Sequence, residues 1–461
     1  MKLKKKRHLF RDSAKWRLLS YYVFFLMRLF YRKITVEGKE NIPVHGPVIF
    51  APNHQNALMD PLAILYAARR QTVFLARADI FKIPLLRNLF FWLKIIPVFR
   101  IRDGKENLGN NEASFNVAVE VLENKRSVCI FPEAAHTNLR SLLPLRKGVP
   151  RLAFMAEEKN NFKLGLNVVP TGIYFDNYEH MRSVLHVRFG KPIAVNQFET
   201  EYGQNPQKAM LTFRDKLTDK LSGLALDIKT REYYDVFYSL SHMFSEPLIM
   251  AEKKTKLRQE HRFLKQKEMV AAFEDKLAKD PEYMLEFRSK GLRFLRTLKT
   301  HGIKWEFFSL PSHGFFRLLF DCLLLLLTLP VFLYGLINNI LFYGSVMVLV
   351  KKIKDHQFHS SIKFVWGLAV SPLFYVIQSI VVYALSGSFF GSIAYLALLP
   401  VTGFLARIWV ANFIEILQQL KLYWLKRTNN KSFFEIVKDW NSFKAEIQSV
   451  CLAGNQSRLR H

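Results

Sequence analysis

The segment VIFAPNHQNALMDPLAILYAA occupies residues 48–68 and carries most of what the sequence says about the fold. It begins with a short apolar run at 48–51 that is typical of a buried strand, and it ends with a helical pattern at 61–68. His54 and Asp60 lie between the two. If the chain turns back after the strand, the aspartate can fix one ring nitrogen of the histidine, and the other can take a proton from a hydroxyl. The same spacing also fits a loop histidine and an aspartate that merely caps a helix.

The alternation of strand and helix continues on both sides of this segment. Helical patterns recur at 84–93, 112–123, 149–157 and 205–227, and further strand-like runs lie at 34–36, 73–76, 97–101, 128–131, 168–174 and 185–189. This alternation predicts an α/β domain with a largely parallel sheet over residues 33–230. In such sheets the functional site forms in the loops beyond the strand ends.

A second polar cluster follows the run at 128–131. Pro132 ends the strand and places Glu133 at the sheet edge. Its carboxylate can accept hydrogen bonds from a polyol hydroxyl, or it can cap a turn. His136 is a weaker candidate for a second base, because a lone loop histidine is usually not catalytic.

Basic residues gather near the same edge. Arg100 and Arg102 fall on one face of the chain by strand alternation, and arginine binds phosphate oxygens bidentately. This pattern fits a phosphate site, a solvated surface or a patch for lipid headgroups. The other basic residues of the group are Lys105, Arg140, Arg146 and Lys147.

These motifs together resemble the phospholipid and glycerol acyltransferase superfamily, which includes glycerol-3-phosphate and 1-acylglycerol-3-phosphate acyltransferases. The resemblance covers residues 36–197. Four motifs carry it in order, namely Asn53-His54 with Asp60, the segment 99–102, Phe131-Pro132-Glu133, and Val169-Pro170.

The resemblance implies a role for each matching residue. His54 would be the general base and Asp60 its orienting partner, Arg102 would bind phosphate, and Glu133 would help to bind the acceptor. We extend the substrate-binding set to Arg100, Arg146 and Lys147. Pro170 would lie on the acyl-chain side. The chain departs from the family pattern at Ala134, where glycine is usual, and at Ile101, where an acidic residue is usual.

The implied chemistry is direct transfer of an acyl group from a thioester to a hydroxyl. It requires no metal and no cofactor, and the acyl donor would be acyl-CoA or acyl carrier protein. The expected acceptor is glycerol-3-phosphate, because a C-terminal membrane region after a long charged stretch resembles the longer glycerol-3-phosphate acyltransferases. The alternatives are a lysophosphatidate acceptor and a non-catalytic membrane scaffold.

The charge and cysteine content of the chain limit the kinds of partner and site that we expect. The 461 residues carry 67 Lys and Arg against 38 Asp and Glu, a net charge of +29, which favours an anionic partner. No nucleic-acid recognition motif is present, so we expect a lipid bilayer and a phosphorylated substrate rather than nucleic acid. The 3 cysteines show no paired spacing, which argues against a disulfide scaffold and a structural zinc site.

Apolar residues cluster near the C-terminus and predict an integral membrane protein. The run 364–406 has no charged side chain, and its Ser386-Gly387-Ser388 turn divides it into expected spans at 364–385 and 389–408. The stretch 315–350 fits one long span or a re-entrant or interfacial pair of half-spans broken near Asn338 and Asn339. Basic residues at both of its ends favour the second interpretation, with the α/β domain facing the cytoplasm.

The remaining segments complete the expected organisation. Residues 1–32 combine a polybasic arm with an aromatic-rich helix and predict an amphipathic membrane anchor. Residues 231–311 read as a charged helical spacer with a break at Asp280-Pro281. The membrane region is expected over 312–425, and 426–461 form a C-terminal tail.

Overall fold

The structure, a computed structural model, describes residues 9, 13–82, 84–99, 109–135, 137, 139–253, 259–309, 314–428 and 430–458. Its internal contacts divide the chain into two compact units. The first comprises Met1–Asp227 with Ile353–Phe364, and the second comprises Ile228–Lys352 with Val365–His461. Five residues discussed above, Arg100, Ile101, Arg102, Lys105 and His136, lie outside the described residues.

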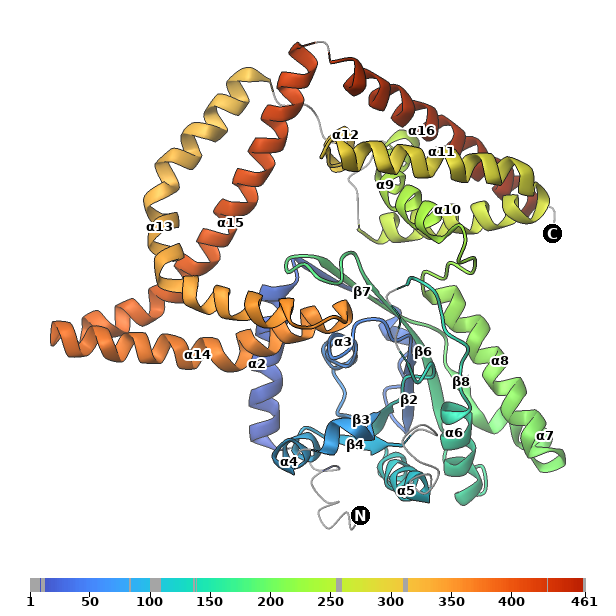
Figure 1. The fold of residues 1–461 in the computed structure, drawn as a ribbon. Helices are drawn as coiled ribbons and strands as arrows, with labels where there is room; N and C mark the ends of the chain where they lie inside the picture. Colours follow the sequence, from blue (N-terminus) through green and yellow to red (C-terminus); the bar gives the residue numbers. More distant parts are fainter. Residues whose placement is uncertain are drawn as a thin grey trace. The chain divides into compact units, whose positions relative to one another are not determined.

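The first unit is built on one twisted sheet in the order β1-β7-β6-β2-β5-β3-β4, with β8 added beside β6 (Figure 1). Only the pairs that β6 makes with β7 and β8 are antiparallel, so the largely parallel sheet is confirmed. The strands are β1 (Lys33–Glu37), β2 (Val48–Pro52), β3 (Thr72–Arg77), β4 (Ile95–Val98), β5 (Ser127–Cys129), β6 (Asn167–Phe175), β7 (Val184–Phe189) and β8 (Ile193–Ala194).

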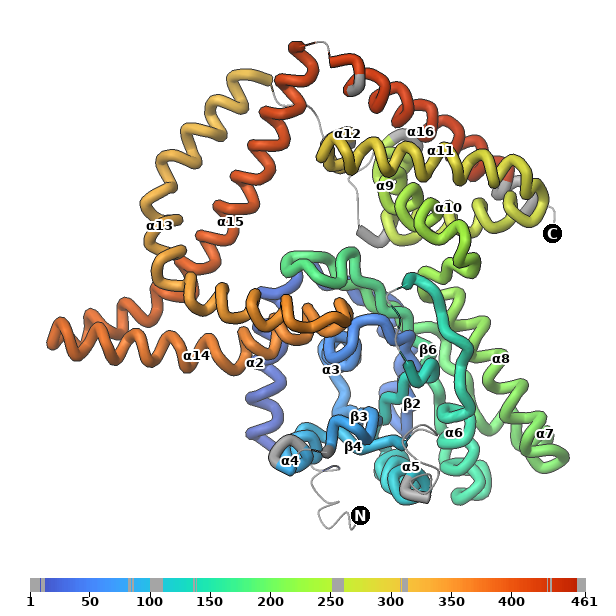
Figure 2. Tube along the Cα trace, in the orientation of Figure 1, coloured from blue at the N-terminus to red at the C-terminus, as the bar shows by residue number. Residues whose placement is uncertain are grey.

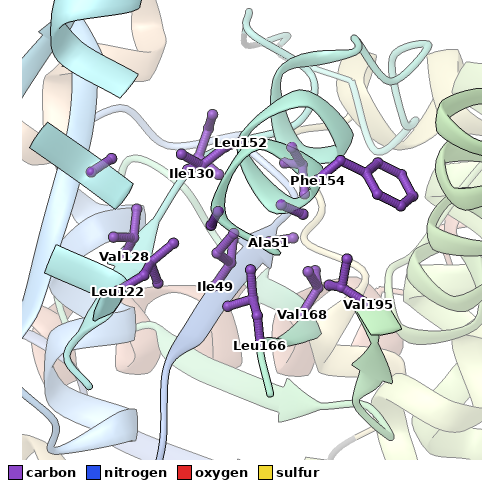
Figure 3. Packing of buried hydrophobic residues seen from close by; sticks show 14 of the residues in the cluster. Ile49, Ala51, Leu122, Val128, Ile130, Leu152, Phe154, Leu166, Val168 and Val195 are labelled. Atoms are coloured by element: carbon purple, nitrogen blue, oxygen red, sulfur yellow. The ribbon is translucent and has the colours of Figure 1, made fainter. Parts of the chain in front are cut away.

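Helices flank this sheet and close its core. Every residue of β2 is buried, because the strand runs between β5 and β6 in the middle of the sheet. Ile49, Val128 and Val168 of neighbouring strands pack with Leu122 and Leu152 of the helices (Figure 3). The helices are α2 (Ala14–Phe30), α3 (Met59–Ala68), α4 (Pro84–Trp92), α5 (Gly109–Glu123), α6 (Gly148–Lys159), α7 (Glu199–Gln204) and α8 (Pro206–Leu224).

The second unit is helical, and Figure 2 traces its path. The expected break is confirmed, because Asp280 caps α11 by accepting the N–H of Tyr283. Its helices are α9 (Tyr234–Lys253), α10 (Gln259–Lys279), α11 (Pro281–Thr300), α12 (Glu306–Ser309), α13 (Phe315–Lys351), α14 (His359–Ser386), α15 (Phe389–Arg427) and α16 (Lys431–Arg458); the first turn of α14 belongs to the first unit.

The expected tail is helix α16, and it packs on the expected spacer. Trp440 lies 4.3 Å from Phe244 between ring centroids, and Phe443 lies 5.2 Å from Phe294. The Tyr283 hydroxyl donates to Glu446 at 2.8 Å. Helices from both sides of the apolar region therefore form one bundle.

Among the described residues, three helices are long and apolar enough to cross a membrane, over Phe315–Lys351, His356–Ser386 and Phe389–Arg427. The turn at 386–388 separates the last two, as the sequence predicts. The expected break near Asn338 and Asn339 is absent, because α13 is helical throughout. Both amides donate to carbonyls one turn earlier in the helix, at 2.8 and 2.9 Å, so neither asparagine interrupts it.

Candidate active site

The site begins where β2 ends. Asn53 ties the chain to β6, since its amide donates to the Ile173 carbonyl at 3.0 Å and accepts the Ile173 N–H at 2.7 Å. This pairing fixes the backbone one residue before His54. His54 therefore leaves the carboxyl end of a central strand on an anchored loop, which is where parallel sheets place functional side chains.

His54 and Asp60 are brought together. His54 Nδ1 lies 2.8 Å from Asp60 Oδ2, and the same oxygen accepts the backbone N–H groups of Gln55 and Asn56 at 2.8 Å. Asp60 is fully buried and lies in the first turn of α3, where the helix dipole favours a carboxylate. The buried carboxylate can accept the Nδ1–H of His54, and in that tautomer the lone pair of the ring is on Nε2.

Glu133 joins the second polar cluster to the first. Its Oε1 accepts the backbone N–H of His54 at 2.8 Å, and its Oε2 accepts that of Leu143 at 2.8 Å. The His54 ring also stacks on Phe131, with 4.2 Å between centroids. The loop after β2 and the loop after β5 are thus held as one structure.

Glu133 is a carboxyl group in an apolar setting. It is 2% exposed, and burial raises its pKa to about 8 although two backbone N–H groups oppose the shift. The next residue, Ala134, has a φ of 55°, in the left-handed region that favours glycine. Ala134 therefore adopts a backbone conformation that favours glycine, at the position where the family pattern has glycine.

The basic residues separate into different environments. Arg146 and Lys147 are exposed after the Glu133 loop. Arg140 is buried, donates to the Phe175 carbonyl and stacks 3.8 Å from the Tyr178 ring, so it supports the fold rather than a phosphate. Arg100 and Arg102 fall outside the described ranges.

A segment that sequence reasoning missed also contacts the loop of His54. Within the first unit, Ser361 Oγ accepts the N–H of Leu58 at 3.1 Å. Ser360 donates to the Tyr178 carbonyl, and the Tyr178 hydroxyl donates to Gln55 Oε1 at 2.5 Å. Residues 353–364 thus support the loop of His54 from a distant part of the sequence, and no local pattern marks them for this role.

The same segment is anchored by ionisable side chains. His356 Nδ1 lies 2.9 Å from Glu179 Oε1, and Lys363 donates to the Glu179 carbonyl at 2.8 Å. His359 places Nε2 2.9 Å from the Ile353 carbonyl and Nδ1 3.8 Å from Glu179. Glu179, His356 and His359 are metal-ligating types with ligand atoms within 4.8 Å of one another, and their contacts hold the segment to the loop after β6.

Comparison with known proteins found a family model and relatives that match this part of the sequence. The family model described as Acyltransferase matches residues 33–174, the part of the chain that holds both polar clusters. A 1-acyl-sn-glycerol-3-phosphate acyltransferase of Borreliella burgdorferi is 28% identical over 153 residues, which is 33% of this chain and 56% of that protein. The glycerol-3-phosphate O-acyltransferase 2 of Saccharomyces cerevisiae is 29% identical over 117 residues, 25% of this chain and 16% of that protein.

The chain thus spans about half the length of the first relative and a sixth of the second. A crystal structure of the 1-acyl-sn-glycerophosphate acyltransferase PlsC from Thermotoga maritima aligns with a TM-score of 0.34 and 19% identity, over 47% of this chain and 84% of that chain. The family match and the two sequence relatives confirm the resemblance to the phospholipid and glycerol acyltransferase superfamily.

Proposed function

We propose that the protein is a membrane-bound O-acyltransferase that moves a fatty acyl group from a thioester to a glycerol-phosphate acceptor. The pairing of His54 Nδ1 with buried Asp60 at 2.8 Å carries the proposal. A histidine oriented in this way is a general base for a hydroxyl, and acyl transfer is the chemistry of the family that residues 33–174 match.

The reaction follows from this pair. His54 Nε2 takes the proton of the acceptor hydroxyl while the oxygen attacks the thioester carbonyl carbon. The carbon–sulfur bond then breaks, and the departing thiolate recovers the proton from His54. Asp60 stabilises the imidazolium that forms in between.

A covalent route through Cys129 is disfavoured. This cysteine lies in β5, close to the Glu133 loop, and is fully buried. Burial and the charge of Asp60 raise the pKa of its thiol well above the usual value. It is therefore held as a thiol, whereas a nucleophile would have to be a thiolate. Direct attack by the acceptor hydroxyl fits the site better.

The other predicted residues have supporting roles in this proposal. Glu133 holds the backbone of His54 and so positions the base. Arg100, Arg102, Arg146 and Lys147 would bind the acceptor phosphate beside it. Holding the phosphate brings the hydroxyl to near-attack distance of the carbonyl, which can supply a large part of the rate enhancement.

We propose glycerol-3-phosphate as the acceptor, supported by the long helical region that follows the α/β domain and by the yeast relative's name. A second candidate is 1-acylglycerol-3-phosphate, because the Borreliella burgdorferi relative with that specificity in its name covers more of this chain. The α/β domain would face the cytoplasm, where acyl-CoA and acyl carrier protein are found, because Lys351, Lys352 and Lys354 flank the apolar helices.

An acceptor assay tests the proposal. Purified full-length protein is incubated with labelled glycerol-3-phosphate or labelled lysophosphatidate, each with acyl-CoA and with acyl carrier protein donors. Acylated glycerol-3-phosphate is the expected product. Acylation of lysophosphatidate alone would establish the second candidate. Acylation of neither acceptor would contradict the proposed activity and favour a non-catalytic membrane scaffold.

A further inference from the structure

A large cleft lies at the edge of the sheet opposite to His54. It has a volume of about 1030 Å³ and is formed by α2, the end of α3 and the residues just before β2, β3 and β5. His54 follows the carboxyl end of β2, whereas Gly46 of the cleft precedes its amino end. At about 3.3 Å per residue, the length of β2 separates the two by roughly 15 Å.

Cationic side chains concentrate in this cleft, and no described lining residue is acidic. The strand register explains the concentration, since Thr72 of β3 pairs with Ser127 of β5. Arg70 and Arg126, just before these two strands, therefore emerge at the same edge. The lining cations are Arg17, Arg28, Arg69, Arg70, Lys125 and Arg126.

Close packing of these cations is unfavourable without an anion. The guanidinium of Arg70 donates to the Gly46 carbonyl at 2.8 Å. This carbonyl is a neutral acceptor, so the hydrogen bond does not neutralise the positive charge of Arg70. Burial and the nearby charge of Arg126 lower the pKa of Arg70. Like charges held together in this way gain most from a ligand with several anionic oxygens.

Helix α2 lines the cleft with aromatic rings as well as with Arg17 and Arg28. Trp16, Tyr21, Phe24 and Phe25 of α2 line it, and Tyr21 and Phe25 are 68% and 58% exposed. Arg28 links the cationic and aromatic groups of the cleft, because its Nε donates to the Tyr66 hydroxyl at 3.1 Å. A cleft in which cations lie beside exposed aromatic rings matches a molecule that joins a phosphate to a hydrocarbon chain.

We infer that this cleft is a second binding site, distinct from the candidate active site, for an anionic phospholipid. The phosphate would lie between Arg70 and Arg126, and the acyl chains would follow the aromatic face of α2. Free phosphate shares the headgroup chemistry but leaves the aromatic wall uncovered, so we commit to the lipid. The inference does not depend on the proposed acyl transfer.

A binding assay with matched variants tests the site. Dioctanoyl phosphatidylglycerol is titrated into the full-length protein in nonionic detergent and followed by calorimetry, in parallel with dioctanoyl phosphatidylcholine and inorganic phosphate. The cleft variant is Lys125→Gln with Arg126→Gln. The control variant, Lys163→Gln with Lys191→Gln, removes the same net charge from exposed lysines elsewhere on the α/β domain.

We expect the cleft variant to bind phosphatidylglycerol about tenfold more weakly and the control to bind like wild type. If thermal unfolding shows that the first variant is poorly folded, a second variant, Arg17→Gln with Arg69→Gln, takes its place. It should also bind phosphatidylglycerol more weakly than wild type. Equal affinities for cleft and control variants would overturn the inference. Inorganic phosphate binding as tightly as the lipid, or phosphatidylcholine binding as tightly as phosphatidylglycerol, would overturn the anionic-lipid assignment.

Discussion

In the proposed mechanism, Asp60 decides which nitrogen of His54 acts as the base. Because three donors converge on Asp60 Oδ2 at 2.8 Å, an amide at this position would present N–H groups to some of them. We predict that Asp60→Asn lowers kcat by about 10²–10⁴-fold through loss of the correct tautomer, with a much smaller change in KM. Steady-state acyl-transfer kinetics measure this.

Asp215→Asn on the exposed face of α8 is the matched control and should retain wild-type kcat. Asp60→Asn variants that fold and turn over at the wild-type rate would show that the aspartate merely shapes the loop.

Glu133 predicts a pH dependence of stability. Its pKa is about 8 in the folded protein against an ordinary value of 4.5. Between these values the folded state binds a proton that the unfolded state has released, so the free energy of unfolding falls as pH rises from about 4.5 to about 8. The slope from this one group is at most about 1.4 kcal/mol per pH unit.

Glu133→Gln cannot titrate and should lose this contribution. Chemical unfolding of the wild type and of the variant at a series of pH values measures the two slopes. The difference in unfolding free energy between them should change in favour of the variant as the pH rises. Parallel pH profiles would mean that Glu133 is ionised with its ordinary pKa.

Two glycines of α13 test the packing of the apolar helices. A Cβ on Gly335 would lie 2.3 Å from the Thr402 carbonyl oxygen of α15, whereas one on Gly344 meets nothing within 4 Å. We predict that Gly335→Ala destabilises the protein by about 1–3 kcal/mol, because two backbones must separate. Gly344→Ala should be stabilising by about 0.5–1 kcal/mol, because alanine favours the helix.

Thermal unfolding in detergent compares the two alanine variants directly. The contrast between them controls for the general effect of removing a glycine from this helix. If both substitutions stabilise, α13 and α15 do not pack through Gly335.

At the level of elements, the sequence predicts strands and helices correctly where their packing follows the local pattern of apolar residues. The fully apolar run of β2 predicts a central strand, and the structure confirms it. The sequence predicts a strand at 97–101, whereas β4 spans Ile95–Val98. Because β4 is an edge strand, it tolerates Pro97 within it. The two-residue β8 is too short to leave a pattern.

Only some contacts of the candidate site could be predicted from the sequence. The pair His54 and Asp60 is close in sequence, and its spacing predicts the contact that the structure shows. Glu133 is 79 residues from His54, and Ser361 is 303 residues from Leu58. The contact from Ser361 depends on how the chain returns to the sheet, which no local periodicity encodes.

For the whole molecule, packing restricts the membrane topology. Helices α9–α11 precede α13 and α16 follows α15, yet they form one bundle. A bundle lies on one side of a membrane, so the chain between them crosses an even number of times. The described residues contain three helices long enough to cross, so an even number of crossings leaves at least one of them that does not complete a crossing.

We propose that α13 is this helix, because Arg317 and Lys351 place basic residues at both of its ends. Single cysteines at Gly314, Lys354 and Ser388, in a variant without the native cysteines, test the topology with an impermeant maleimide. We predict that positions 314 and 354 are labelled from the same side and position 388 from the other. Labelling of 314 and 354 from opposite sides would show that α13 crosses.

The most direct measurement is the rate of acyl transfer by purified His54→Ala protein. His180→Ala replaces an exposed histidine of the same α/β domain and serves as the control. We predict that His54→Ala retains its thermal unfolding midpoint but loses acyl transfer to the glycerol-phosphate acceptor by about 10²–10⁴-fold, while His180→Ala keeps the wild-type rate. A folded His54→Ala protein that transfers acyl groups at the wild-type rate would contradict the assignment of His54 as the base.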